Sequence, residues 1–423
     1  MLVGGCVRDR VLGIESKDLD VEVYGLEPAL LRSILEQFGH VNTVGEHFSV
    51  YKVGVQDSAS SERLEIDVSI PRRESKSGRG HRGFLIEGDP GMTFEEAARR
   101  RDFTINAILY DPLRDETVDP YHGLGDFKNH LLRAVSDETF TEDSLRVLRA
   151  VQLAARFELM IDEGTVQLCR GIDLSDLPHE RIWGEIEKLL VMAERPSIGL
   201  SAAHQLEVLD KLFPEIGALV GRRSAHAGED AFEHTKLVVD EAVKLSSDLP
   251  KAKRLTVMLA TLCHDLGEPR TSADEYLAPT ASLLSKLGVH SIGSYDVRSQ
   301  VLSLVQEQGA PRRFYQGTAN DGDFRRLAQR VELDLLYRVA KSCAAGRRGQ
   351  SNAVAEDWFI ERARELGVEH RPPDPLLLGR HLVEAGIEPG PNMGRLLKRV
   401  YELQLDGEVT TQEEALAEAL RLK

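Results

Sequence analysis

The sequence predicts an α+β protein: a small N-terminal head with a mixed sheet and flanking helices, then an all-α neck, body and tail. Period-two alternation, which is typical of strands, occurs within residues 1–70, whereas apolar residues at helical spacing dominate from residue 141 onward. With 423 residues, 42% of them hydrophobic, the chain is long enough for several domains. The expected parts are a head at 1–136, a helical neck with its linker at 137–222, a helical body at 223–348 and a helical tail at 349–423.

The overall charge argues against a surface that binds nucleic acid throughout. The net charge is −16, and binding of phosphates needs local positive charge. Residues 72–101 form a basic region in this acidic chain, so any such contact is expected to be local. The four cysteines are scattered without a CxxC pair, which predicts reduced thiols and a cytoplasmic protein. No stretch reaches the ~20 apolar residues of a membrane span, and the first motif leaves no room for a signal peptide.

The first motif joins paired glycines to two aspartates. Gly4 and Gly5 let the backbone approach a phosphate closely, and Arg8 can neutralise that phosphate. Asp18 and Asp20 alternate along a second strand, so both project from one face and can share divalent ions. Two Mg²⁺ ions held by carboxylates suit phosphoryl or nucleotidyl transfer. A lone Asp-x-Asp pair, by contrast, is usually a solvated strand end or a turn.

Further elements follow in order. Residues 30–38 have the apolar spacing of a helix, and strands are expected at 49–55 and 63–70. Asp67 on the last of these strands is either a third catalytic carboxylate or a solvated strand residue, and the two interpretations are equally good. Residues 71–95 lack periodicity, which predicts a mobile loop, and their position favours a substrate-handling lid over a plain surface connection.

Two charged motifs come next. Arg101 and Asp102 lie in a run of arginine and aspartate; guanidinium groups suit triphosphate oxygens, and a short carboxylate can accept hydrogen bonds from ribose hydroxyls. A helix is expected to begin with Thr141 as its N-cap. Asp143 and Arg146 lie three residues apart on that helix, a spacing that usually gives a surface ion pair worth ~0.3 kcal/mol.

In this order, the motifs resemble those of the class II tRNA nucleotidyltransferases and bacterial poly(A) polymerases of the polymerase-β superfamily. The resemblance implies template-independent addition of C, C and A to the 3′ end of tRNA from CTP and ATP, with release of pyrophosphate. It assigns the Mg²⁺ ions to Asp18 and Asp20, triphosphate contacts to Arg101 and Arg149, and ribose recognition to Asp102.

The same resemblance gives the helix near residue 145 a role in base selection. It implies that Asp143 and Arg146 read the Watson–Crick edge of the incoming base, because together they offer an acceptor and several donors. Gln152 stands where the family often has another arginine, and glutamine cannot supply the charge. The following helices, including residues 181–190, are expected to form a neck with no chemistry of its own.

A second cluster resembles an HD-type metal phosphohydrolase domain. His234 and the pair His264-Asp265 offer imidazole and carboxylate ligands, which suit a transition metal. Active relatives carry a lysine where this chain has Glu268 and an aspartate where it has Cys343. Three remaining ligands hold a metal poorly, so we expect a degenerate domain kept as a helical scaffold or tRNA platform.

Four alternatives remain. An enzyme that adds only A shares every motif. A poly(A) polymerase is disfavoured because residues 45–48 lack the Gly-basic-basic-Phe pattern and the tail is ordinary. A metal phosphohydrolase with a vestigial head, or a non-catalytic tRNA-binding module, conflicts with the intact carboxylates of the first motif. Whether the protein is a monomer or a homodimer stays open.

Overall fold

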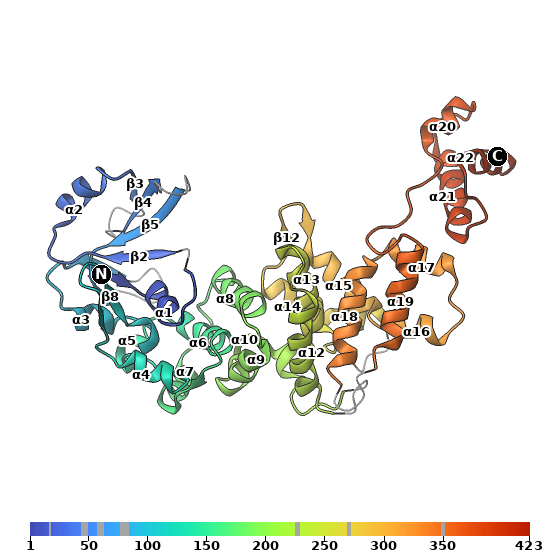
Figure 1. The fold of residues 1–423 in the computed structure, drawn as a ribbon. Helices are drawn as coiled ribbons and strands as arrows, with labels where there is room; N and C mark the ends of the chain where they lie inside the picture. Colours follow the sequence, from blue (N-terminus) through green and yellow to red (C-terminus); the bar gives the residue numbers. More distant parts are fainter. Residues whose placement is uncertain are drawn as a thin grey trace. The chain divides into compact units, whose positions relative to one another are not determined.

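The computed structural model describes residues 1–16, 18–43, 50–56, 63–76, 84–224, 229–268, 272–347 and 352–423 (Figure 1). These residues pack as two compact units. The first unit holds Met1–Leu189 and Ile198–Leu212, and the second holds Leu190–Ser197 and Phe213–Lys423. The finer division into head, neck, body and tail stays a prediction.

The head is built on a seven-stranded mixed sheet, so the expected α+β class is confirmed. The strand order is β3-β4-β5-β2-β1-β8-β9, in which β2 and β5 are parallel and the other pairs are antiparallel. Their bounds are β1 Leu2–Val3, β2 Leu19–Glu22, β3 His40–Thr43, β4 Val50–Gln56, β5 Arg63–Ser69, β8 Leu109–Asp111 and β9 Glu116–Val118. The parallel β2–β5 pair places the two predicted aspartate strands side by side.

Helices cover the sheet because alternate strand residues are apolar. Helix α2 (Pro28–Leu35) buries Leu31 against Tyr51, Val53 and Val68 of the sheet. Another cluster joins Val7 of helix α1 (Gly5–Val11) to Ile108. These contacts fix α1, and therefore the glycine turn that precedes it, against the start of β2.

Part of the predicted mobile loop is regular structure, which corrects the expectation for residues 71–95. Strands β6 (Arg72–Lys76) and β7 (Phe84–Gly88) pair antiparallel, and residues 77–83 lie outside the described part. Residues 71–83 mix glycine, serine and charged side chains without apolar alternation, so no strand was expected in this segment. Arg73 joins the ribbon to its surroundings through Asp89, with 2.7 Å between Nε and Oδ2.

Helices dominate the rest of the first unit. They are α3 Phe94–Arg99, the 3-10 turn η1 Thr104–Asn106, α4 Gly123–Lys128, α5 Asp137–Phe140, α6 Leu145–Arg156, α7 Glu163–Gly171, α8 His179–Met192, α9 Pro196–Gln205 and α10 Val208–Leu212, with short strands β10 Leu131–Leu132 and β11 Met160–Ile161. The expected N-cap at Thr141 is wrong. Thr141 ends α5, its hydroxyl donates to the Glu138 carbonyl oxygen, and α6 begins at Leu145.

The second unit is almost entirely helical. Its elements are α11 Pro214–Gly217, α12 Ala231–Leu245, α13 Lys251–Cys263, α14 Ala273–Lys286, β12 Ser291–Ile292, β13 Tyr295–Asp296, α15 Val297–Glu307, α16 Ala310–Gln316, α17 Asp321–Ala328, α18 Leu333–Ala345, α19 Val354–Glu365, α20 Gly379–Glu384, α21 Pro391–Asp406 and α22 Gln412–Arg421. Residues 255–263 of α13 are all buried, which makes this helix the centre of the unit.

The last helices have a small core of their own. It includes Leu382, Leu396, Val400 and Ala415 from α20, α21 and α22.

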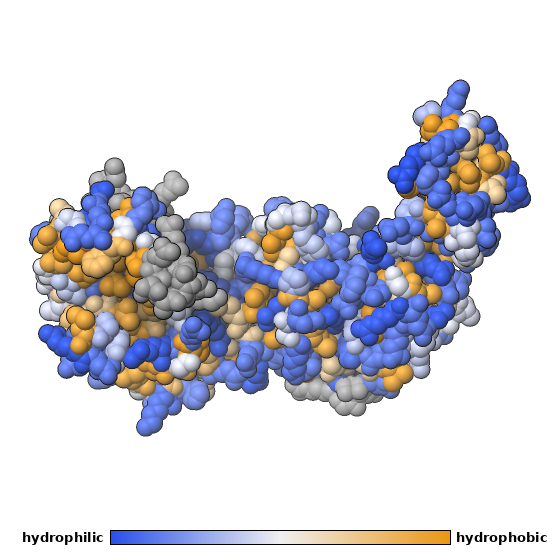
Figure 2. Space-filling view, turned by 45° about the horizontal axis from the view of Figure 1, so that its top comes forward, coloured by the Kyte–Doolittle hydropathy of each residue, from blue (hydrophilic) through white to orange (hydrophobic). Residues whose placement is uncertain are grey.

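Hydrophilic residues cover much of the face shown in Figure 2, and apolar residues lie in patches between them. Among the described helices, none is long and apolar enough to cross a membrane.

Candidate active site

The aspartates of the first motif meet a third carboxylate on the neighbouring strand. Asp20 and Asp67 are register partners in the parallel β2–β5 pair, and Asp18 lies just before β2. Lys52, the antiparallel partner of Asp67 on β4, places its Nζ 3.1 Å from Asp67 Oδ1. The structure therefore brings the three predicted catalytic aspartates to one end of the sheet, with Lys52 balancing part of their charge.

The charge of Asp20 is costly in the protein alone. Burial raises the pKa of Asp20 above its ordinary value, the Arg101 guanidinium lowers it, and the charges of Asp67 and Asp18 raise it further. Within the described residues, however, these carboxylates do not form a group whose ligand atoms all lie within 4.8 Å of one another. The site thus has the type of oxygen donor that a hard cation needs, with the carboxylates spaced more widely than in a closed metal cluster.

Gly4 is required where the glycine turn meets this site. Its φ of +74° lies in the left-handed region, and a Cβ atom there would lie 3.0 Å from Arg101 Nη1 and 3.5 Å from Asp20 Oδ2. A side chain at this position would therefore strain the backbone and push Arg101 away from Asp20. A Cβ on Gly5 would lie 3.5 Å from Arg8 Nη2.

Arg8 is buried and engaged with protein groups. Its Nη2 lies 2.6 Å from Asp9 Oδ1, its Nη1 donates to Asn106 Oδ1 at 2.9 Å, and its guanidinium lies 4.5 Å from the centroid of the Phe157 ring. Burial lowers the pKa of Arg8, and the Asp9 charge raises it. The proposed phosphate contact of Arg8 stays a prediction, while its contacts here tie α1 to η1.

Glu22 is a site residue that the sequence interpretation missed. It follows Asp20 by two residues on β2 and is 1% exposed. Its Oε1 lies 2.6 Å from Arg100 Nη2 and 4.0 Å from Arg101 Nη2, and Tyr24 donates to its Oε2 at 2.7 Å. Glu22 therefore anchors the arginine pair beside the aspartates. The alternation Asp18, Asp20, Glu22 was the available signal.

Asp102 is the hub of a buried network. Its Oδ2 accepts from Arg149 Nε at 2.6 Å, and its Oδ1 accepts from Asn106 Nδ2 at 2.9 Å and from the Phe103 amide at 2.8 Å. Burial alone would raise the pKa of Asp102, but Arg149 and Asn106 bring it below its ordinary value. The predicted ribose reader, which lies just before η1, thus contacts one predicted triphosphate contact on α6.

The remaining predicted pair is arranged differently from the expectation. Asp143 forms a forked ion pair with Arg181 of α8, at 3.2 Å to Oδ1 and 2.9 Å to Oδ2. Arg146 donates to the carbonyl oxygens of Thr139 at 2.7 Å and Arg100 at 2.6 Å. The ion pair spans 38 residues and links α8 to the segment just before α6, and such a contact leaves no periodic signal in the sequence. The expectation that the neck has no chemistry of its own stays a prediction.

Gln152 occupies the interior of α6. It is 3% exposed, and its Nε2 atom has no hydrogen-bond partner among the described residues. The position expected to carry a cation therefore faces the core in this protein, and it cannot supply charge to a nucleotide from there.

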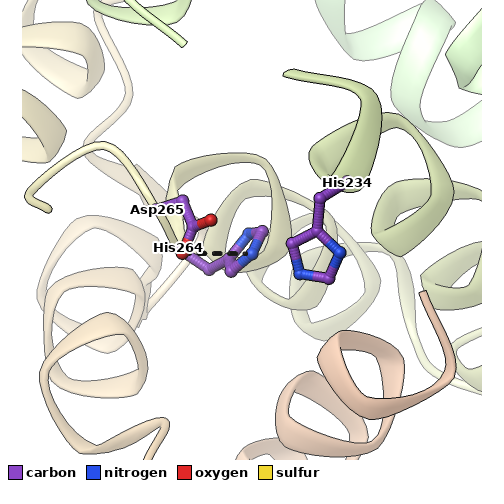
Figure 3. A group of neighbouring side chains, drawn as sticks. All are labelled: His234, His264 and Asp265. Atoms are coloured by element: carbon purple, nitrogen blue, oxygen red, sulfur yellow. Dashed lines mark ion pairs between the residues drawn. The ribbon is translucent and has the colours of Figure 1, made fainter. Parts of the chain in front are cut away.

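The second predicted cluster does converge. His234 lies on α12, and His264 and Asp265 directly follow α13 (Figure 3). One ligand atom from each lies within 4.8 Å of the others, and the two rings are 5.1 Å apart between centroids. Nδ1 of His264 donates to the Thr261 carbonyl oxygen at 2.7 Å, which leaves its Nε2 as the lone-pair atom, 3.5 Å from Asp265 Oδ1. These three residues could hold one transition metal ion.

The surroundings of this cluster combine a thiol with several arginines. A cavity of about 480 Å³ is lined by both histidines, by Cys343 and by several arginines, among them Arg312. Burial, together with the charge of Asp265, raises the pKa of the Cys343 thiol. At neutral pH this side chain is therefore a neutral thiol in the place predicted to need a carboxylate.

Comparisons with known proteins agree with this geometry. A family model described as the poly A polymerase head domain matches residues 1–133. A multifunctional CCA protein from Stenotrophomonas maltophilia (strain K279a) is 40% identical over 384 residues, covering 84% of this chain and 87% of that protein. Another, from Haemophilus influenzae (strain PittGG), is 36% identical over 310 residues, covering 69% and 71%.

Solved structures share the fold. A CCA-adding enzyme in complex with CTP aligns with a TM-score of 0.67 at 21% identity, covering 100% of this chain and 90% of that chain. The Thermotoga maritima CCA-adding enzyme complexed with tRNA_CCA aligns with a TM-score of 0.64 at 20% identity, with the same coverage. At these identities the likeness concerns the fold alone.

Proposed function

The chain belongs to the family of the multifunctional CCA proteins, and we propose that it adds C, C and A to the 3′ end of tRNA from CTP and ATP, releasing pyrophosphate. The observation that carries this function is the arrangement of Asp20 and Asp67 as register partners on neighbouring strands, with Asp18 just before β2 and with Arg101 and Asp20 both next to the glycine turn at Gly4.

Mg²⁺ is the proposed cofactor, and Asp18 and Asp20 are its proposed ligands. Their carboxylate oxygens are the donor type that this ion prefers. Burial first, and then the charges of Asp67 and Asp18, raise the pKa of Asp20, and a bound cation would offset this cost of its charge. When bound, Mg²⁺ would lower the pKa of the primer 3′-hydroxyl and stabilise charge on the phosphate. Asp67 is proposed to support the same site, with Lys52 holding its carboxylate in place.

The arginines and the remaining carboxylates are proposed to bind the nucleotide. Arg101 would hold triphosphate oxygens, and its position beside Asp20 suits a group that spans both. Asp102 would accept a hydrogen bond from a ribose hydroxyl. Arg149 could then turn from Asp102 toward a phosphate of the nucleotide. Asp143 and Arg146 would read the base edge.

The cluster of His234, His264 and Asp265 is proposed to have no hydrolase activity. Cys343 stands where active relatives carry an aspartate. Glu268 stands where they carry a lysine, and its carbonyl oxygen accepts a hydrogen bond from Arg222 Nη1 at 2.6 Å. The second unit would then serve as a helical scaffold or tRNA platform. We also propose a cytoplasmic site of action, in keeping with four free, buried cysteines.

The test uses three tRNA substrates that lack CCA, lack CA or lack A, each with CTP, ATP or both. The proposal predicts that the first substrate is extended by all three nucleotides when both triphosphates are present. Extension of only the substrate that lacks A would replace it with A addition alone. Runs of A on any of the three would instead indicate a poly(A) polymerase.

A further inference from the structure

Helix α8 presents two charged side chains to two residues that are proposed to bind nucleotide, Asp143 just before α6 and Arg149 on α6. Arg181 and Glu185 are four residues apart and therefore lie on one face of α8. Arg181 forms a forked ion pair with Asp143, and the negative charge of Glu185 raises the pKa of Arg149. Opposite charges thus face each other along two helices that are separated in sequence.

The contact to Asp143 fixes that carboxylate from both sides. Arg181 Nη1 reaches Oδ1 and Nη2 reaches Oδ2, and the Leu145 amide donates to Oδ1 at 3.1 Å. The two side chains are 24% and 31% exposed, so the pair is half-buried beside an open surface. A forked Arg–carboxylate pair defines orientation as well as distance, which a single point charge does not.

Arg146 is held in a separate way. It donates to the carbonyl oxygens of Thr139 and Arg100, and its guanidinium lies 6.0 Å from the centroid of the Phe140 ring. The two proposed base-reading groups are therefore each fixed before any nucleotide binds, one by α8 and the other by backbone carbonyl oxygens.

We propose that Arg181 is a positioning residue for base selection, which holds the Asp143 carboxylate in the orientation that accepts a hydrogen bond from the incoming base. This inference rests on the proposed role of Asp143. Because discrimination among bases depends on where an acceptor points, loss of this fork should affect selectivity more than the rate of transfer.

The experiment measures kcat and KM for CTP and for UTP on tRNA that lacks CCA. Arg181→Ala should lower the selectivity ratio, which is kcat/KM for CTP divided by kcat/KM for UTP, about tenfold. The value of kcat with CTP should change less. Arg181→Lys should restore part of the ratio, because an ammonium supplies charge without the fork. Equal losses with CTP and UTP, or an unchanged ratio, would overturn the inference.

Two further variants separate the possible failures. Asp143→Ala alone should lose the selectivity, and adding Arg181→Ala to it should cause no further loss, because Arg181 acts through Asp143. If Asp143→Ala keeps full selectivity, the proposed role of Asp143 fails. If it loses selectivity while Arg181→Ala keeps it, only the inference about Arg181 fails.

The matched control is Arg338→Ala in the second unit. Arg338 forms another forked pair, with Nη1 at 2.6 Å and Nη2 at 3.0 Å from the two Asp248 oxygens. Its loss should leave the ratio for CTP and UTP unchanged even if the melting temperature falls. A change in the ratio equal to that of Arg181→Ala would show that general destabilisation causes the effect, and would overturn the inference.

Discussion

Asp20 is held where its charge is unfavourable in the protein without a cation. Because its pKa is raised in the folded state, the folded protein binds this proton more tightly than the unfolded chain does. Stability therefore falls as pH rises through the interval between the unfolded and folded pKa values. Above the folded pKa the full cost is present, and removing the charge should relieve it.

We therefore predict opposite effects of Asp20→Asn on stability and activity. Thermal unfolding without metal should occur at a higher temperature than for the unchanged protein, whereas addition to tRNA should fall by about a thousandfold or more. Binding of tRNA, measured by gel shift, should persist. The control is Asp115→Asn, at an exposed position with φ +56° that asparagine also tolerates. Full activity of Asp20→Asn would contradict the account.

The pKa of Asp102 is shifted in the opposite direction to that of Asp20. Its folded pKa is lowered, so it contributes stability at pH values above its ordinary 3.8, and this contribution is lost as pH falls through the folded pKa. Asp102→Ala leaves Arg149 without its buried partner and should cost about 3 kcal/mol of unfolding free energy. Urea unfolding at neutral and acidic pH should show that the gap between the two proteins narrows on acidification. A constant gap would contradict the electrostatic explanation.

Asp102→Ala should also lose discrimination against deoxynucleotides. If the carboxylate accepts a hydrogen bond from a ribose hydroxyl, the ratio of kcat/KM for CTP to kcat/KM for dCTP should fall about tenfold in this variant. Competition between labelled CTP and dCTP on one tRNA measures this ratio. Loss of activity with both substrates at an unchanged ratio would assign Asp102 to structure alone.

At the scale of elements, strand β2 organises the head. Its alternation places Asp20 and Glu22 on one face, so one strand supplies both a proposed metal ligand and the anchor of the arginine pair. Because Glu22 is buried and forms ion pairs with Arg100 and Arg101, neutralising it removes the carboxylate that holds both arginines. We therefore expect the side chain of Arg101 to be held less firmly beside the aspartates.

Glu22→Gln should therefore weaken binding of both nucleotides. We expect KM for CTP and for ATP to rise about tenfold, with a smaller change in kcat, because Arg101 loses its support. Steady-state kinetics with each nucleotide measures the effect. Glu65→Gln on β5, which faces Lys52 on the surface, is the control and should leave both values near those of the unchanged protein. Unchanged KM values for Glu22→Gln would contradict the anchor role.

Sequence patterns predicted the elements that have strong periodicity. Strands β2, β4 and β5, the helix at residues 30–38 and the helical remainder follow from the spacing of apolar residues, which tertiary packing preserves, whereas β3, β8 and β9 were not predicted. The β6–β7 ribbon was missed because it has no apolar alternation. The start of α6 was misplaced because Thr141 has the chemistry of an N-cap but ends the preceding short helix instead.

The site was predictable where its residues lie close in sequence. Asp18, Asp20, Arg101 and Asp102 belong to local motifs, and the structure brings them to one end of the head. Long-range partners such as Arg181 could not be found, because nothing in the sequence specifies which helix α8 faces. The nearness of His234 to His264 was suggested only by the resemblance, since they lie on separate elements.

At the scale of the whole molecule, the two units differ in the chemistry that they retain. The first unit keeps oxygen donors and arginines together. The second keeps three possible metal ligands beside a neutral thiol at Cys343. Under the proposed function we expect a division of labour, in which transfer chemistry belongs to the first unit and the second unit serves as a scaffold or tRNA platform.

The whole protein should therefore fail to hydrolyse cyclic phosphates. With added Ni²⁺ or Mn²⁺, release of product from a 2′,3′-cyclic nucleotide should stay at the level of a heat-denatured sample, while the same preparation adds CCA to tRNA. Chromatography of the nucleotide products measures this. Rapid turnover would show that Cys343 does not disable the second centre.

The most direct test of the central claim is anomalous scattering from crystals soaked with Mn²⁺ and CTP. The account predicts a manganese peak at the carboxylates of Asp18 and Asp20, next to the phosphates of CTP. Density for CTP in the head with no metal at these two residues would contradict the claim that they form the transfer site.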